Sequence, residues 1–219
     1  MYFASRVQAG RMLATRLAEN YSFRSCAVLA LNDGGVMIGA QIAMQLRCVL
    51  TLLASSEITL PREPEAIAGI TPGGVMAYNH SSYSPGEIDE MVGEYYGFLE
   101  QEKLTRMHDM NMLIGSNGAV DKELLKGHDV IVVTDGLKTG FPVDLAAEFL
   151  KPIAIEKLVV ATPFASVSAV DRMHILADDL YCLNVISDYI DTDHYYDKQD
   201  VPDHETVLKT IEQITLNWK

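Results

Sequence analysis

Short apolar runs alternate with polar, glycine-containing segments along the chain, and this alternation predicts buried strands separated by helices. The clearest run is residues 130–133, four consecutive β-branched side chains between Gly127 and Gly136. A run this short and apolar indicates a strand that is buried on both faces. Small and polar residues follow over 134–140, and residues 143–150 have helical character. The sequence therefore predicts a strand, a loop and a helix over 130–150, around which the rest of the chain is organised.

The same alternation extends to both sides of this unit. Apolar spacing predicts a first helix over residues 5–19, with Ala9, Leu13 and Leu17 on one face. A strand over 26–31, a turn at 32–35, a helix over 36–46 and a strand over 48–53 follow. This order indicates a parallel pair of strands with a right-handed crossover. After the central unit we expect strands over 157–162 and 180–186, a loop and helix over 163–177, and a last helix from about residue 202.

Residues 54–86, called the hood below, interrupt this rhythm with four prolines and four glycines. We expect short strands over 66–70 and 74–79, which would make the hood a β-rich lid inserted into the α/β core. Ser84 and Glu87 have the spacing of a capping box and predict the start of one long helix that reaches about Asp109. The chain is thus expected to form a single domain over 1–219 with a hood at about 54–86.

Composition narrows the classes of function. The 219 residues carry a formal net charge of −13, which argues against nucleic acid or an anionic membrane as a partner. A polyanionic substrate would need locally concentrated positive charge. Three cysteines without C-x-x-C spacing, together with the lack of an apolar run of about 20 residues, favour a reduced cytoplasmic protein. A homo-oligomer is compatible with these properties.

The central loop has the composition of an anion site. Gly136 and Gly140 allow close approach of a ligand to the backbone, and the free N–H groups at the start of the following helix favour an anion. Asp135 at the end of the strand could hold sugar hydroxyls. An ordinary strand-to-helix turn, with Asp135 and Thr139 as local caps, is the alternative from the residues alone.

This stretch resembles the ribose-phosphate loop of the type I phosphoribosyltransferases. The matching positions are residues 130–133, Asp135, Leu137, Thr139 and Gly140, and the departures are Thr134, Lys138 and Pro142. Short motifs elsewhere, in the same order and spacing, resemble a subgroup of predicted phosphoribosyltransferases over nearly the whole chain. They include Arg6, Ala9-Gly10-Arg11, Leu29-Ala30-Leu31, Gly34-Gly35-Val36, Gly73-Gly74-Val75 and Tyr195-Tyr196.

The resemblance implies an α/β fold with a mostly parallel central sheet flanked by helices, and a phosphorylated ribose ligand. That ligand would be phosphoribosyl pyrophosphate, with Mg²⁺ as a possible companion, or a nucleotide. Thr134 and Asp135 would hold the ribose. The phosphate would lie against the loop formed by Gly136, Leu137, Lys138, Thr139 and Gly140. Lys138 could carry charge to the phosphate, point to solvent or pair with Asp135.

The resemblance also indicates what is missing. The family binds pyrophosphate at a loop after the first strand, here Asn32, Asp33, Gly34 and Gly35, and this subgroup has arginine where Asp33 stands. Basic residues that usually follow the second strand are replaced by residues 54–57. Arg62 on the hood could fold over a ligand or remain solvated. We therefore expect a protein that binds phosphorylated ribose with weak or lost transferase activity, or a regulatory or interaction protein that keeps the fold.

The remaining candidates favour ordinary structural roles. The six histidines lack metal-ligand spacing, so no metal site is expected. His194 beside Asp191 and Asp193 could bind a cation, although a solvated acidic loop is favoured. Tyr195 and Tyr196 could stack on a base, although packing of the C-terminal segment is favoured.

Overall fold

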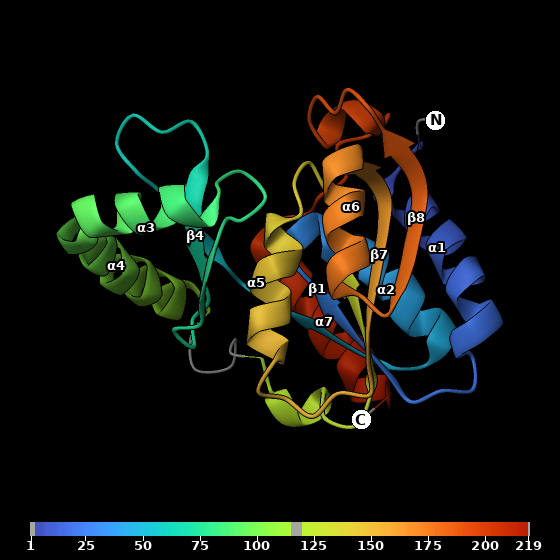
Figure 1. Cartoon of the computed structure of the whole chain (residues 1–219). Helices are drawn as coiled ribbons and strands as arrows, with labels where there is room; N and C mark the ends of the chain where they lie inside the picture. The colour runs from blue at the N-terminus through green and yellow to red at the C-terminus, as the bar shows by residue number, and fades with distance from the viewer. Residues whose placement is uncertain (1–2, 115–119, 219) are drawn as a thin grey trace.

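The computed structural model describes residues 3–114 and 120–218. Its main sheet has five parallel strands in the order β2-β1-β6-β7-β8 (Figure 1). Their bounds are β1 Cys26–Ala30, β2 Val49–Leu52, β6 Asp129–Val133, β7 Lys157–Ser166 and β8 Asp179–Ile186. The predicted strand over 130–133 lies in β6, the middle strand. Both the α/β class and the parallel order of the sheet are confirmed.

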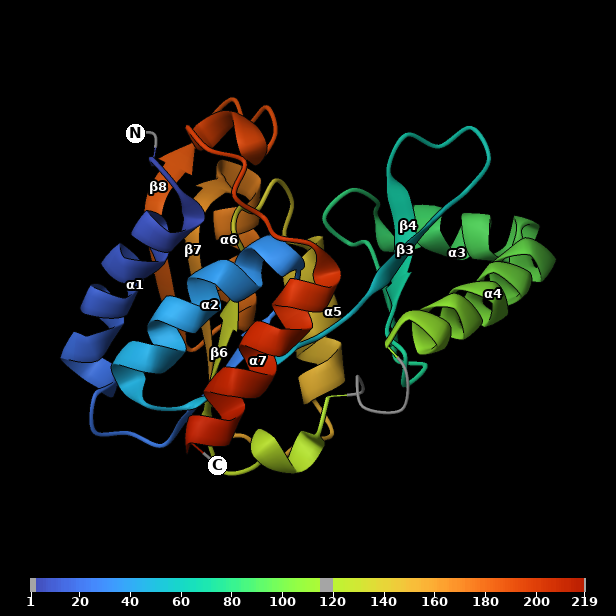
Figure 2. The same cartoon turned by 180° about the vertical axis from the view of Figure 1, so that it is seen from behind.

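Helices cover both faces of the sheet, as the all-apolar strands require. Figure 2 shows α1 (Arg6–Tyr21), α2 (Asp33–Leu46) and α7 (His204–Trp218) on one face, and α5 (Phe141–Leu150) and α6 (Val167–Leu176) lie on the other. Side chains of β6 alternate between them: Ile131 and Val133 pack under α1 and α2, and Val130 and Val132 pack under α5. Burying each such side chain contributes about 1.5–3 kcal/mol.

Two elements begin or end differently from the expectation. The turn predicted at 32–35 is the first turn of α2, because the Asn32 side chain accepts a hydrogen bond from the Gly35 N–H at 2.6 Å and caps the helix. Strand β7 continues through Pro163 to Ser166, where a loop was predicted. The additional residues of β7 matter for the site, because Phe164 and Ser166 hold the central loop.

The hood contains a separate antiparallel sheet of three strands, β3 (Ser56–Thr59), β4 (Ala66–Ile70) and β5 (Met76–Tyr78). The strand predicted over 66–70 is confirmed, and β3 was not predicted. Ser84 and Glu87 do form a capping box, but the single long helix is wrong. The chain turns at Tyr95, so α3 (Pro85–Glu94) and α4 (Tyr96–Ile114) are two helices, and both pack against β3–β5.

The hood sheet stands beside α5 and contacts the core through it (Figures 1 and 2). Ala66 and Ala77 of the hood form one buried cluster with Phe141 and Leu145. Gly69 makes this contact possible, because a Cβ there would lie 2.9 Å from the Phe141 ring. The hood is therefore anchored at the helix that begins at the central loop.

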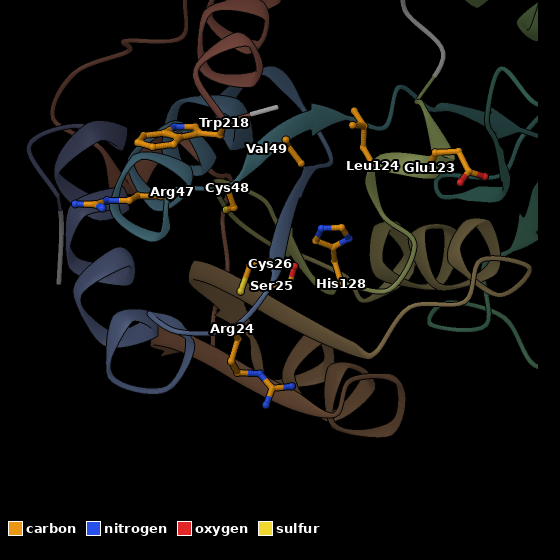
Figure 3. Close-up of a pocket in the computed structure, with 10 residues that line it drawn as sticks. All are labelled: Arg24, Ser25, Cys26, Arg47, Cys48, Val49, Glu123, Leu124, His128 and Trp218. Atoms are coloured by element: carbon orange, nitrogen blue, oxygen red, sulfur yellow. The ribbon is translucent and has the colours of Figure 1, made fainter.

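The amino ends of the strands surround a hollow of about 450 Å³ (Figure 3). Cys26 and Cys48 line it, and burial raises the pKa of Cys26 to about 11 and that of Cys48 to about 12. These two cysteines and Cys182 are free thiols, as predicted. The hollow lies at the end of the sheet opposite to residues 32–35 and 134–140, and its thiols are held in the unreactive protonated form.

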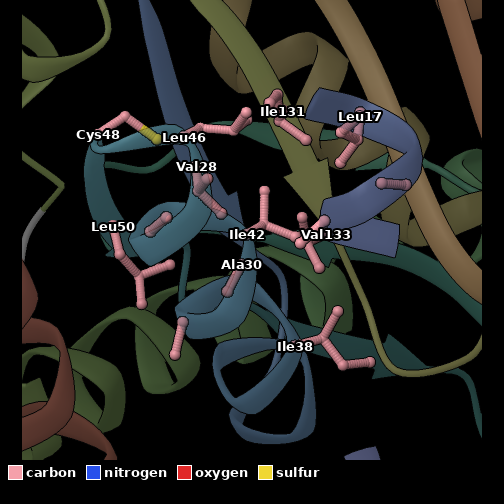
Figure 4. Close-up of a cluster of buried hydrophobic side chains, with 14 of the residues drawn as sticks. Leu17, Val28, Ala30, Ile38, Ile42, Leu46, Cys48, Leu50, Ile131 and Val133 are labelled. Atoms are coloured by element: carbon pink, nitrogen blue, oxygen red, sulfur yellow. The ribbon is translucent and has the colours of Figure 1, made fainter. Parts of the chain in front are cut away.

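The largest buried cluster fills the space between the sheet and α1, α2 and α7 (Figure 4). It fixes α2 against β1 and β6, and thereby places the first turn of α2 beside the end of β6. None of the helices within 3–114 and 120–218 combines the length and apolar character that a membrane span requires.

Candidate functional site

The loops that follow β1 and β6 lie side by side at the carboxyl edge of the main sheet, where ligands bind in open parallel α/β folds. The Asn32 amide donates a hydrogen bond to Asp135 Oδ1 at 2.8 Å, and the Leu31 N–H donates to the Val133 carbonyl at 2.9 Å. These two bonds hold the loop after β1 against the loop after β6.

The glycine pair of α2 permits this approach. A Cβ on Gly34 would lie 2.0 Å from Asp135 Oδ2, and a Cβ on Gly35 would lie 2.8 Å from the Val133 carbonyl oxygen. Because neither the buried carboxylate nor the strand backbone has room to retreat, the two positions require glycine. The first turn of α2 thus packs directly on the end of β6.

A buried guanidinium connects this edge to two distant parts of the chain. Arg6 is 2% exposed; its Nε donates to Asp135 Oδ2 at 2.7 Å, and its Nη2 donates to Asp193 Oδ1 at 2.5 Å. Nη1 lies 3.5 Å from Asp200 Oδ1. The guanidinium also lies over the Tyr196 ring, 4.5 Å from its centroid. Burial by itself lowers the pKa of Arg6, but the bond to Asp193 and the charge of Asp135 outweigh it and raise that pKa.

Residues 187–203, called the strap below, cover the two loops. The Tyr196 hydroxyl donates to the Asp135 carbonyl at 2.7 Å, and the Tyr189 hydroxyl lies against Gly136, where a Cβ would approach it to 2.3 Å. The strap pairs with the start of the chain, because the Phe3 N–H donates to the Tyr195 carbonyl at 3.0 Å. Tyr195 and Tyr196 are buried among aromatic rings, so the packing interpretation of this pair is confirmed.

Burial, as the largest cause, raises the pKa of both strap tyrosines near Asp135. The pKa of Tyr189 rises to about 12, with the Asp135 charge adding to the effect of burial. For Tyr196, burial and the same charge raise the pKa further, although the Arg6 charge opposes them. Both hydroxyls are therefore protonated donors across the physiological range.

The central loop presents unpaired donors at the start of α5. The Leu137 N–H is used, because it donates to the Phe164 carbonyl of β7 at 3.0 Å. The backbone N–H groups of Lys138, Thr139, Gly140 and Phe141 make no hydrogen bond within 3–114 and 120–218. Gly140 is the N-cap of α5 and offers no side chain to these donors. Such a helix start is suited to an anion.

Comparison with known proteins identifies the family of the chain. A model of the phosphoribosyl transferase domain matches residues 3–200. The chain belongs to the phosphoribosyl transferase domain family. The family resemblance stated from the sequence is thereby confirmed.

Individual relatives support this assignment. Two Mycobacterium tuberculosis proteins named "Putative phosphoribosyl transferase" (MT0597 and Rv0571c) are each 28% identical over 182 residues. The match takes in 83% of this chain but only 40% of theirs, so the chain spans well under half the length of these relatives. The crystal structure of TT1426 from Thermus thermophilus superposes with a TM-score of 0.70 at 26% identity, over 100% of this chain and 99% of that one.

The residues at which sequence analysis expected a pyrophosphate loop have the following partners in the structure. Asp33 lies in the first turn of α2, and its Oδ1 is 3.1 Å from His204 Nδ1 at the start of α7. Ser56 begins β3 and accepts a bond from Arg106 of α4 at 3.4 Å, while Ser55 is exposed. The positions at which sequence reasoning sought cations thus carry an acid and two hydroxyls in the structure.

Two cationic side chains considered from the sequence are exposed. Arg62 lies in the turn between β3 and β4 with a φ of 75°, and it makes no ion pair among the described residues. Lys138 is exposed as well, and Asp135 pairs with Arg6 in its place. Of the three roles considered for Lys138, contact with solvent or with a phosphate remains.

Sequence reasoning missed Arg6 and Arg172. Arg6 received no role in the site, although its place in the family resemblance and the aspartates of 188–200 were available as signals. Arg172 of α6 lies against Gly140 and bonds Asp144 at 2.7 Å through Nε. Ser81 of the hood also reaches Asp144, at 3.4 Å. Gly140 therefore lies where the loop, α6 and the hood meet.

Proposed function

We propose that this protein binds a phosphorylated ribose ligand, either phosphoribosyl pyrophosphate or a nucleotide, at residues 134–140. The observation that carries the proposal is the group of unpaired N–H donors at the start of α5, in a chain of the phosphoribosyl transferase domain family. Residues 136–140 would form the cradle, with Lys138, Thr139 and Gly140 as the donors, because the Leu137 N–H is already used. The helix dipole of α5 adds to the attraction for phosphate.

Thr134 and Asp135 would face the ribose in this proposal. Both Asp135 oxygens already accept one bond, from Arg6 and from Asn32. A carboxylate oxygen has a second lone pair, so a sugar hydroxyl can still donate to it. Arg6 and Asn32 would then orient Asp135 for the sugar.

Transfer from phosphoribosyl pyrophosphate would be weak or absent. Pyrophosphate leaves with several negative charges, and Asp33, Ser55 and Ser56 occupy the positions that should stabilise them. Loss of one preorganised donor to a transition-state charge costs about 2.7–4 kcal/mol. The hood, within the single domain of residues 1–219, would restore a cation to the loops by bringing Arg62 or a partner's cation over the ligand.

Mg²⁺ would reach the site with the ligand. Nowhere in the described part of the chain do three or more His, Cys, Asp or Glu side chains gather in a way that could hold a metal ion. Oxygens of phosphoribosyl pyrophosphate would supply the coordination, and Asp33 is the carboxylate of the pyrophosphate loop that could approach such an ion. The metal would supply charge neutralisation for the leaving group.

A non-catalytic regulatory or interaction protein is the second candidate. The strap favours it, because Tyr196 and Arg6 cover Asp135 and leave it 4% exposed. In that case the protein would use the fold to bind a partner, and a bound ligand would regulate that interaction.

Calorimetric titration with ribose 5-phosphate and with ribose tests the proposal. We expect binding of ribose 5-phosphate and none of ribose, because the phosphate contacts supply most of the affinity. Equal affinities for ribose 5-phosphate and for ribose would contradict the proposed function. Lys138→Gln should weaken the binding of ribose 5-phosphate about threefold to tenfold if Lys138 contacts the phosphate. Lys151→Gln, the same change at the far end of α5, is the control.

Gly140→Val is not a suitable probe of this loop. A Cβ at Gly140 would lie 2.4 Å from Arg172 Cβ and Cγ. The variant would displace Arg172 from Asp144 and disturb the packing of α5 on α6, so a loss of binding could not be assigned to the loop backbone. Variants of exposed Lys138 avoid this conflict.

A further inference from the structure

The contacts of Arg6 are unbalanced in charge. One guanidinium faces three carboxylates, Asp135, Asp193 and Asp200. The side chain of Asp135 is 6% exposed, whereas those of Asp193 and Asp200 are 51% and 23% exposed. The buried partner comes from the central loop and the two accessible partners come from the strap. The outer side of the guanidinium is therefore covered by acids that can move into solvent.

Arg6 is also the buried cation beside the pyrophosphate loop. A Cβ on Gly34 would lie 2.8 Å from Arg6 Nε. The loop positions that would provide cations in this subgroup carry none here, and Asp33 pairs with His204. A guanidinium offers five N–H donors in a planar fork that suits phosphate oxygens. Arg6 of α1 thus supplies, beside the pyrophosphate loop, the cationic N–H donors that the loops themselves lack.

We propose that Arg6 is the anion-binding residue of this site, and that Asp193 and Asp200 hold the place of a phosphate or pyrophosphate group of the ligand. This inference rests on the proposed function. An incoming anion takes the Arg6 donors that Asp193 and Asp200 occupy, and the two carboxylates turn to solvent. The Arg6–Asp135 bond stays, so that the guanidinium connects the ribose-facing acid to the anion.

The arrangement of the strap permits this exchange without unfolding. Besides the bonds from the Arg6 backbone N–H to Asp200, the strap is anchored by the pairing of Phe3 with Tyr195 and by the Tyr196 hydroxyl on the Asp135 carbonyl. Asp193 lies in a short exposed turn, and its side chain makes its bond to Arg6 through one oxygen. Rotation of the Asp193 and Asp200 side chains frees the donors, and Asp200 then also gives up its bonds from the Arg6 backbone N–H. The strap acts as a built-in competitor that weakens the binding of anions.

Titration with inorganic pyrophosphate tests the inference directly. The test variant is Asp193→Asn with Asp200→Asn. Asparagine keeps an acceptor oxygen for the Arg6 guanidinium and for the Arg6 backbone N–H, which donates to Asp200. The control is Asp188→Asn with Asp197→Asn, which removes the same charge from exposed strap positions that make no ion pair within the described residues. Isothermal calorimetry at one low ionic strength compares both with the unmodified protein.

We expect the Asp193 and Asp200 variant to bind pyrophosphate about tenfold more tightly than the unmodified protein, since two competing charges are gone. The control should change the affinity less than about threefold, because exposed charges are screened by salt. Equal gains in both variants would show a general charge effect and overturn the inference. Unchanged affinity in the test variant would overturn it as well.

Arg6→Gln in the Asp193 and Asp200 background provides the second arm. This triple variant should lose the gain in pyrophosphate affinity, while circular dichroism shows an intact fold. If the triple variant fails to fold, Asp193→Asn alone replaces it. That single variant should show part of the gain in pyrophosphate affinity. Ribose 5-phosphate separates the two proposals. If it binds the unmodified protein while pyrophosphate affinity never depends on the strap, the function stands and the role of Arg6 is refuted. If no variant binds either compound, both are refuted.

Discussion

Charges at the two ends of the main sheet are arranged differently. At the amino end, Arg24 pairs with Asp129, and Lys157 bonds Asp179 at 2.9 Å, so that each cation has one acid. Arg24 precedes β1 and Asp129 begins β6, while Lys157 and Asp179 begin β7 and β8. These pairs join neighbouring strands. At the carboxyl end, by contrast, one guanidinium serves three acids.

This difference is the basis for the proposed anion-binding role of Arg6. The amino-end pairs are balanced, and Arg24 lies at the rim of the hollow in Figure 3. The carboxyl end has an excess of acid, a covering strap and unpaired N–H donors close by. The two groups of charges thus differ in the number of acids that face each cation and in the burial of the cation.

Replacement of Arg6 should have the largest effect on stability. Arg6→Met leaves Asp135 buried without its cation, and removing one partner of a buried ion pair costs about 3–5 kcal/mol. Urea unfolding at pH 7 measures the loss. Lys157→Gln is the comparison at the amino end, where the side chains of Lys157 and Asp179 are 41% and 39% exposed and the loss should be smaller. A loss below about 1 kcal/mol for Arg6→Met would mean that the network is not a structural centre.

Gly34→Ala should have the second largest effect. The added methyl group would meet Asp135 Oδ2 at 2.0 Å, and forcing such a group into a packed site costs about 1–3 kcal/mol. Gly93→Ala is the matched control, because its methyl group would meet nothing within 4 Å in α3, and it should stabilise the protein by about 0.5–1 kcal/mol. Equal unfolding free energies for the two variants would contradict the close packing of the loops.

Much of the fold was predictable because its signals are local. Apolar runs such as 130–133 lie within the observed strands, and the Ser84 capping box begins α3 as expected. The break at Tyr95 was missed because the apolar spacing of residues 91–99 continues across it. Strand β3 was missed because Ser56, Glu57 and Thr59 are polar, and they become a strand by pairing with β4.

The site was less predictable because its decisive contacts join residues far apart in the chain. Local motifs identified Asp135 and the glycines at 34 and 35. They included Arg6 in the family resemblance but did not show that this residue, 129 positions from Asp135, would be the cation between them. Nor did they indicate that His204 would meet Asp33. Such pairings depend on the packing of α1 and α7 on the sheet, which the pattern of a single segment does not contain.

The Asp179 cluster should give the smallest effect and a clear pH dependence. Bonds from Tyr21 and Lys157 hold the pKa of Asp179 below its usual value. The carboxylate therefore contributes stability above its unfolded pKa, and the contribution is lost as the pH falls through the lower folded pKa. Because the side chain is 39% exposed, Asp179→Asn should cost less than about 1 kcal/mol at pH 7 and progressively less as the pH falls toward about 2. Urea unfolding at both pH values measures this; a difference that is independent of pH would contradict it.

Pyrophosphate release from phosphoribosyl pyrophosphate and Mg²⁺ tests the central claim most directly. The claim is that the carboxyl edge keeps a phosphate cradle, but that its pyrophosphate loops carry no cation and the nearby Arg6 is occupied by carboxylates. With a panel of purines, pyrimidines and orotate, the unmodified protein should release no base-dependent pyrophosphate above background, although it binds ribose 5-phosphate. Asp33→Arg with Ser55→Arg and Ser56→Lys should raise the affinity for phosphoribosyl pyrophosphate before any rate appears. Robust, base-dependent turnover by the unmodified protein would contradict the account.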